Sequence, residues 1–128
     1  MHRVIASMLF ASACLLLVGC DEFKPADNAS GLDKDARQEL FKLARMNGCT
    51  ECHRVNAVVI GPSWVQISDR YKDAPFEDSK ALLIERVKKG SSGNWMTFKG
   101  GDGMPPMERR VSAQAVEQLV EYILNLRR

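Results

Sequence analysis

The pentapeptide Cys49-Thr50-Glu51-Cys52-His53 carries the most informative pattern in this chain of 128 residues. A C-x-x-C-H motif indicates covalent attachment of haem. Two thiols separated by two residues on one helical turn can reach the two vinyl groups at one edge of the porphyrin, and the adjacent imidazole then serves as the proximal iron ligand. The motif therefore predicts one haem c, bound covalently through Cys49 and Cys52, with His53 on the iron.

Other chemistries that use cysteine and histidine fit the motif poorly. Structural zinc requires about four ligands, and the adjacent Cys52 and His53 offer poor chelating geometry. A thioredoxin-like redox pair is expected within a βαβ pattern, but no strand signal accompanies the motif. A cysteine nucleophile needs a histidine base, whereas His53 belongs to the motif itself. The motif thus favours haem over these alternatives.

The first 19 residues predict a signal peptide. Arg3 supplies a short basic start, the run 4–18 is almost wholly apolar, and Gly19-Cys20 closes it. The apolar run is shorter than the roughly 20 residues that a membrane-spanning helix needs, and it suits the apolar region of an export signal. A buried first helix or a retained anchor helix is the alternative interpretation.

Residues 17–20 (LVGC) resemble the end of a bacterial lipoprotein signal, in which cleavage leaves the cysteine N-terminal and acylated. We therefore expect Cys20 to carry acyl chains that attach the chain to the periplasmic side of the bacterial inner membrane. In the lipoproteins that this segment resembles, an aspartate after the cysteine often marks retention in the inner membrane, and Asp21 holds that position. Ordinary cleavage nearby, which would give a soluble periplasmic protein, is the alternative. Residues 20–32 are polar and aperiodic, and they predict a flexible tether.

Charge and cysteine content exclude further classes of protein. Loss of Arg3 with the signal leaves 17 basic against 16 acidic side chains, a net charge of +1, which excludes a strongly basic nucleic-acid-binding protein. Cys14 would leave with the signal and Cys20 would be acylated, so a disulfide framework is not available. A domain of roughly 90 residues is small enough for a bound cofactor to contribute strongly to its core.

His53 would be the only histidine in the processed chain, since His2 lies in the signal segment. Two histidine ligands from one chain are thereby excluded. The sixth position on the iron is left to a methionine, to an unusual group such as lysine, or to no protein ligand. A thioether sulfur would favour Fe(II) and raise the reduction potential relative to a second imidazole.

Three methionines after the motif compete for the sixth position: Met96, Met104 and Met107. Met104 directly precedes Pro105-Pro106, whose restricted backbone dihedrals would hold the sulfur at a defined place. We therefore predict Met104 as the second axial ligand. Met96 and Met107 are expected to fill gaps in a small core.

Hydrophobic periodicity predicts an all-α fold of about four to five helices around one haem. Helices are expected over 34–47, around 64–71, over about 78–89 and from 112 to 127. Asp33 and Ser112 are the predicted N-caps, and Gly48 and Gly90 the predicted helix ends. The glycine-rich segment 90–106 is predicted to be a long loop. Loops of this length are unusual in a compact domain unless they have a function, so we expect this loop to have one. The first and last helices are expected to pack through Leu40, Leu43 and Ala44 against Val116, Leu119, Val120 and Ile123.

The segment from about Leu40 to Leu126 resembles the class I bacterial cytochromes c of the short c-551/c-552 type. The matching runs are ELFKLARMNGCTECHRV, IGPSWVQISDRY and ERVKKGSSGNWMTFKGGDGMPPM, followed by the terminal helix. The resemblance implies a cytochrome c domain over residues 33–128, behind a lipoprotein signal at 1–19 and a tether at 20–32.

The resemblance also implies roles for residues around the haem. In the family, a Gly-Pro pair packs against the haem and the proline carbonyl accepts a hydrogen bond from the proximal imidazole, which Gly61-Pro62 matches. A family tryptophan before the axial methionine reaches a haem propionate, and Trp95 occupies the corresponding place. The residues between Trp95 and Met104 are more numerous than in the short family members. Trp64 is expected to pack at the haem edge.

The expected function is single-electron transfer and not enzymatic catalysis. With both axial positions filled, no small-molecule substrate can bind the iron, so electrons pass through the exposed haem edge to and from redox protein partners. No nucleic-acid partner is expected. Two alternatives remain open at this point. One is a haem enzyme or gas sensor with an open sixth position, and the other is a fixed electron-transfer subunit of a membrane oxidoreductase complex.

Overall fold

Helices make up the regular structure in the computed structural model, which describes residues 32–95 and 103–127. In chain order they are α1 (Lys34–Met46), α2 (Cys49–Cys52), α3 (Trp64–Tyr71), α4 (Phe76–Lys89), α5 (Ala113–Leu124) and the 3-10 turn η1 (Asn125–Arg127). These described residues contain isolated antiparallel bridges but no strand. None of their helices has the length and apolar character needed to cross a membrane. The predicted all-α class is therefore confirmed.

Capping residues determine where three of the helices begin. Asp33 and Ser112, both predicted as N-caps, accept hydrogen bonds from backbone N–H groups three residues further on, at 2.8 and 3.2 Å. Ser63 begins α3 in a reciprocal capping box with Gln66, because each side chain accepts from the backbone N–H of the other residue. These bonds satisfy donors that the first turn of a helix leaves open.

Two helices differ at their ends from the sequence prediction. α4 begins at Phe76, earlier than the expected start near Asp78, directly after Pro75, whose φ of −53° already suits helix entry. Acidic residues in its first turn, Glu77 among them, interact favourably with the helix dipole. The last α-helix ends at Leu124, short of the expected 127, and tightens into the 3-10 turn η1.

The face of α4 that packs against α5 is one of two that helical spacing would allow. Leu82 and Leu83 both fit the spacing in the sequence, but Leu82 is 39% exposed. Leu83, Ile84 and Val87 pack against the buried residues of α5 instead. Helical spacing alone fits two neighbouring stripes of α4, and packing against α5 selects between them.

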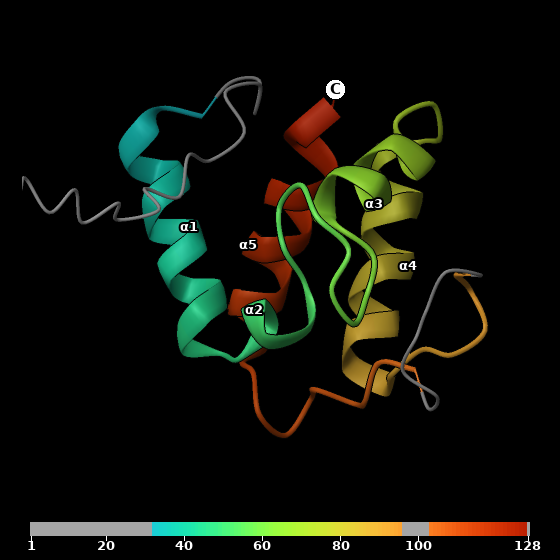
Figure 1. Ribbon diagram of the computed structural model, residues 1–128. Helices are drawn as coiled ribbons and strands as arrows, with labels where there is room; N and C mark the ends of the chain where they lie inside the picture. Colours follow the sequence, from blue (N-terminus) through green and yellow to red (C-terminus); the bar gives the residue numbers. More distant parts are fainter. Residues whose placement is uncertain (1–31, 96–102, 128) are drawn as a thin grey trace, which may run out of the picture.

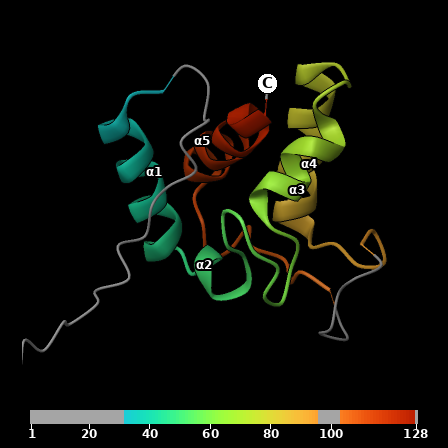
Figure 2. The same ribbon diagram turned by 45° about the horizontal axis from the view of Figure 1, so that its top comes forward.

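The central element is α5, which lies between α1 on one side and α3 and α4 on the other (Figures 1 and 2). Its buried residues are Ala115, Val116, Leu119, Val120, Tyr122 and Leu124. From α1, Ala44 is buried and Leu40 and Leu43 pack beside it, as predicted. Ser68 of α3 donates a buried hydrogen bond to the Leu124 carbonyl oxygen at 3.1 Å. Contact with neighbours on two sides explains why α5 is apolar over most of its surface.

Candidate haem site

The two cysteines of the motif lie on α2, a single helical turn that follows α1 almost directly. Gly48 joins the two helices with a φ of +74°, a left-handed conformation that glycine adopts without steric cost. Cys49 and Cys52 are both half-buried, and no disulfide joins them. Burial raises the pKa of the Cys49 thiol, and the neighbouring Cys52 adds to this rise, against an opposing backbone hydrogen bond. One turn of helix thus presents two thiols together, as the motif predicted.

His53 follows α2 in an extended conformation, and its imidazole is anchored by one nitrogen. Its Nδ1 lies 2.7 Å from the carbonyl oxygen of Pro62. A carbonyl can only accept, so Nδ1 carries the proton and donates, which leaves the Nε2 lone pair available to a metal. Burial lowers the pKa of His53 and so favours the neutral ring, while the hydrogen bond to Pro62 opposes this shift. A neutral, oriented imidazole is the form in which histidine ligates a metal.

Gly61 supports the same imidazole from its side. The backbone N–H of Gly61 donates to the Cys52 carbonyl oxygen at 2.8 Å, which brings the glycine close to the ring. A Cβ atom at this position would lie 2.6 Å from Cε1 of His53 and 3.0 Å from its Nδ1. Only a residue without a side chain leaves room for the ring.

All six residues that the sequence predicted to surround the haem line one cavity. Its volume is about 570 Å³, within the range of natural cofactor pockets. The six are Cys49, Cys52, His53, Pro62, Trp95 and Met104. Apolar side chains of α5 line the cavity as well: Val116, Leu119, Val120 and Ile123. Two other residues named from the sequence, Cys20 and Met96, lie outside the described residues.

Met104 reaches the cavity from the segment that follows the end of α4. Its backbone exchanges two hydrogen bonds with Ser91, at 2.7 and 2.9 Å. The next methionine, Met107, also lines the cavity and packs against the buried residues around Val111 and Val116. The packing role predicted for Met107 agrees with these contacts. The cavity therefore has two thioether side chains in its wall.

The two tryptophans have different surroundings. Trp95 lies in the cavity wall, with the Arg70 guanidinium 4.7 Å from its ring centre, a cation–π arrangement. Trp64 is 2% exposed and packs edge-on against the rings of Phe41 and Tyr122, at centroid distances of 6.4 and 6.0 Å. Trp64 thus joins α3 to α1 and α5, in keeping with its predicted packing role.

Two arginines in the cavity wall were missed by the analysis of the sequence. Arg86 of α4 lines the cavity and donates to the hydroxyl oxygen of Tyr71 at 2.6 Å, and Arg110 lines the cavity as well. Their positive charges suit an anionic substituent such as a porphyrin carboxylate. An arginine at such a position does not by itself indicate an anion-binding role from the sequence.

The donor set fits covalent haem and not a protein-bound zinc ion. Among residues 32–95 and 103–127, no group of three or more His, Cys, Asp or Glu side chains is placed to hold a metal. Two adjacent thiols, one neutral imidazole and a thioether instead share a largely apolar cavity. These are the groups that attach a porphyrin and ligate its iron. They define the class of small helical proteins with a covalently bound haem.

Comparison with known proteins identifies the family within this class. Residues 38–127 match the cytochrome c family, and the chain belongs to that family. It is 38% identical over 85 residues to cytochrome c-551 of Allochromatium vinosum, a match that covers 66% of this chain and 82% of the relative. It is 33% identical over 86 residues to cytochrome c-552 of Hydrogenobacter thermophilus, covering 67% and 80%.

Solved structures agree with these relationships. Wild-type cytochrome c552 of Nitrosomonas europaea superposes with a TM-score of 0.59 at 36% identity, covering 68% of this chain and 99% of that one. The class 1 cytochrome MtoD of Sideroxydans lithotrophicus superposes with a TM-score of 0.56 at 31% identity, covering 74% and 97%. The predicted class I cytochrome c fold is confirmed by these neighbours.

Membership of the family determines the cofactor and the general activity. The chain carries one haem c, bound covalently through Cys49 and Cys52 of the C-x-x-C-H motif. As a monohaem cytochrome c it is an electron carrier and not an enzyme. Both conclusions agree with what the motif predicted.

Proposed function

We propose that this cytochrome is an outer-sphere, single-electron carrier whose iron is ligated by His53 and Met104. The observation that carries the proposal is that both side chains line one cavity with the two haem-binding cysteines. His53 presents Nε2 because Nδ1 donates to Pro62. The backbone of Met104 is held at the cavity wall by two hydrogen bonds with Ser91.

The bound haem supplies reversible one-electron chemistry at iron, and the residues around it tune that chemistry. The Pro62 carbonyl orients the imidazole and raises its basicity through the hydrogen bond to Nδ1. We assign Trp95 the role of donating its indole N–H to a haem propionate, which its place in the cavity wall allows. A thioether from Met104 as the second iron ligand would favour Fe(II) and so raise the reduction potential.

The carrier acts on the periplasmic side of the bacterial inner membrane, attached through acylated Cys20. The apolar run 4–18 followed by Gly19-Cys20 supports export and lipidation, and residues 20–32 would then connect the lipid to the domain. The domain itself would exchange electrons with redox protein partners at the membrane surface. Attachment is compatible with a diffusing carrier and with a subunit of a larger complex.

Substitution of Met104 tests the axial ligation. Ferric wild type is expected to show the weak absorption near about 700 nm that iron–thioether bonding gives. Met104→Ala should lose this band, lower the reduction potential and open the iron to carbon monoxide. Met104→His should also lower the potential but keep carbon monoxide out, because imidazole ligates the iron and stabilises Fe(III) better than sulfur. Visible spectra with and without carbon monoxide, together with redox titration, provide the measurements.

Met107→Leu is the matched control, since Met107 also lines the cavity but is assigned to packing. It should retain the band and the wild-type potential. Loss of the band in Met107→Leu alone would transfer the ligand role to that residue and leave the carrier function in place. A wild type that lacks the band and binds carbon monoxide readily would favour an open-site haem protein.

A further inference from the structure

The backbone of Met104 is bonded directly to the residues that end α4. Gly90 follows the last residue of α4, and Ser91 comes next. The N–H of Ser91 donates to the Met104 carbonyl oxygen at 2.9 Å, and the N–H of Met104 donates to the Ser91 carbonyl oxygen at 2.7 Å. This reciprocal pair, an isolated antiparallel bridge, holds Met104 beside the end of a packed helix.

The chain after Met104 is tied to the same helix. Pro105 and Pro106 follow Met104 and restrict the backbone between the two points of attachment. The N–H groups of Met107 and Glu108 then donate to the carbonyl oxygens of Val87 and Lys88, at 3.0 and 3.3 Å. These carbonyls belong to the last turn of α4, which leaves its acceptors without partners inside the helix. Met104 is therefore held on both sides by the end of α4.

Two glycines make this close approach possible. Gly90 and Gly103 both have positive φ angles, of +84° and +82°. A Cβ atom on Gly90 would lie 2.8 Å from the Met104 carbonyl oxygen, and one on Gly103 would lie 2.8 Å from Cβ of Ser92 and collide with the Ser91 carbonyl oxygen. Distances below 3.0 Å do not occur for real Cβ atoms. Any side chain at Gly90 or Gly103 would therefore force apart the two segments that the bridge joins.

We propose that Gly90 and Gly103 are positioning residues for Met104. They permit the Ser91–Met104 bridge, and the bridge determines where the sulfur stands relative to the cavity. The position of the sulfur then depends on the end of α4, and not on the number of residues between Ser91 and Met104. The inference rests on the proposed ligation of iron by Met104.

The test compares two glycine substitutions in the haem-loaded full chain. Gly103→Ala introduces both a strained φ and a collision with the bridge. Gly93→Ala introduces the same kind of strain, since Gly93 has a φ of +70°, but its Cβ would meet no other protein atom within 4 Å. Gly103→Ala should lose the band near about 700 nm, lower the reduction potential and let ferrous protein bind carbon monoxide. Gly93→Ala should keep the wild-type band and potential.

Circular dichroism must show native helicity in both variants, so that loss of the band reports the ligand and not unfolding. If Gly103→Ala keeps the full band and potential, the positioning role is refuted while ligation by Met104 stands. If wild type itself lacks the band, the ligand assignment fails, and the inference fails with it.

Amide hydrogen exchange on wild type provides a second measurement that needs no variant. The bridge predicts slow hydrogen exchange at the backbone N–H groups of Ser91 and Met104. Exchange at the N–H of Gly93, which takes no part in the bridge, should be faster. Exchange at Met104 as fast as in an unstructured peptide would show that the bridge does not hold the ligand, and would overturn the inference even if Gly103→Ala yields no folded protein.

Discussion

At the scale of single residues, the absence of a side chain at Gly61 leaves space for the imidazole of His53 beside the loop backbone. The imidazole is held from one direction by the Pro62 carbonyl oxygen, 2.7 Å from Nδ1, and from another by the backbone at Gly61. Gly61 has no positive φ, so its glycine is required by the close approach and not by its backbone conformation. Glycine is therefore required for different reasons at the two positions. At Gly61 it leaves space for the His53 ring, whereas at Gly48 it permits a positive φ and a Cβ would meet no other protein atom within 4 Å.

Gly61→Ala is expected to displace the imidazole. The added Cβ would stand 2.6 Å from Cε1 of His53, so the ring or the loop must move, at a cost of about 1–3 kcal/mol in the free energy of unfolding. The hydrogen bond to Pro62 should weaken, and the reduction potential should change with it. Gly48→Ala is the control, with a backbone cost of about 1–2 kcal/mol but an unchanged potential. Denaturant unfolding and redox titration measure both effects, and equal potentials in the two variants would contradict this role for Gly61.

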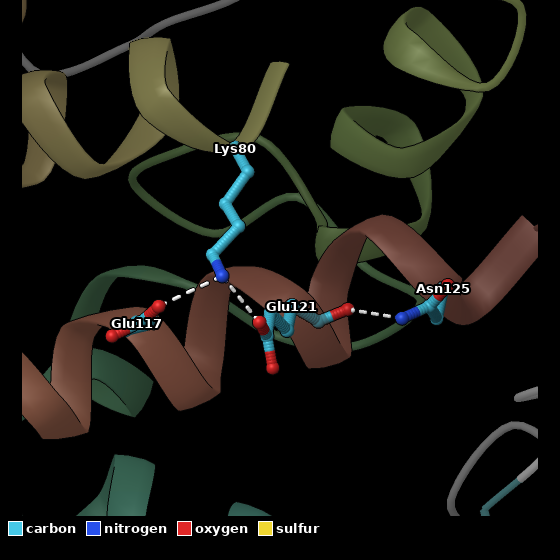
Figure 3. A network of polar contacts seen from close by, with 4 residues as sticks. All are labelled: Lys80, Glu117, Glu121 and Asn125. Atoms are coloured by element: carbon cyan, nitrogen blue, oxygen red, sulfur yellow. Dashed lines mark hydrogen bonds and ion pairs between the residues drawn. The ribbon is translucent and has the colours of Figure 1, made fainter. Parts of the chain in front are cut away.

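At the scale of elements, an ion cluster joins α4 to α5. Lys80 of α4 extends between Glu117 and Glu121, which lie one turn apart on α5, at 2.7 and 2.5 Å from their carboxylates (Figure 3). Carboxylates four residues apart on a helix repel each other, and the ammonium group between them removes that repulsion. The hydrogen bonds that Lys80 donates to Glu117 and Glu121 raise the pKa of the lysine above its ordinary value. Only 15% of the lysine side chain is exposed, unlike most surface ion pairs.

Lys80→Met should lower the melting temperature, because it leaves the two carboxylates of α5 without their shared cation. A group whose pKa is raised in the folded state stabilises that state fully below the ordinary lysine value of 10.5, and the contribution declines as pH rises above it. The difference in melting temperature from wild type should therefore be constant near neutral pH and shrink only above that value. Thermal melts across this range measure it.

Lys89→Met is the control for Lys80→Met, since Lys89 pairs with Glu85 of the same helix and both side chains are largely exposed, at 71% and 59%. Exposed pairs of this kind contribute little to stability. An equal change in melting temperature in the two variants would show that the cluster between the helices adds nothing beyond a surface pair.

At the scale of the whole molecule, the haem cavity exists because separate elements converge around α5. Its wall combines α2, α3, α4 and α5 with the segment that carries Met104. Leu32 and Asp33, the described residues before α1, do not line this wall, so the proposed membrane attachment and electron transfer are expected to be separable. Loss of the anchor should change where the cytochrome is found, and not what its iron does.

Cys20→Ser tests this separation. Wild type should remain with membranes after a high-salt wash and partition into detergent, because two or more acyl chains give stable attachment. Cys20→Ser should release a spectrally normal cytochrome or leave an uncleaved precursor. Cys14→Ser, within the signal segment, should behave as wild type. Fractionation with haem staining provides the measurement, and recovery of wild type wholly in the soluble periplasmic fraction would refute the anchor.

Local sequence patterns were sufficient to predict the haem-binding motif, two N-caps and the positions of the helices. The spacing of Cys49, Cys52 and His53 places them on and directly after a single turn, so their joint chemistry needs no tertiary contact to be recognised. Asp33 and Ser112 act as caps on N–H groups three residues away, again within one turn. Helical periodicity located the helices and the all-α class for the same reason: each depends on neighbours close along the chain.

Contacts between distant segments could be settled only by packing. Two stripes of α4 fit the periodicity equally, and contact with α5 partly buried Leu83 and left Leu82 at the surface. The partners of Lys80 and the collision that a side chain at Gly103 would cause depend on how α4 lies against α5 and against the Met104 segment. Such distances follow from the crossing of whole helices, which no short stretch of residues encodes.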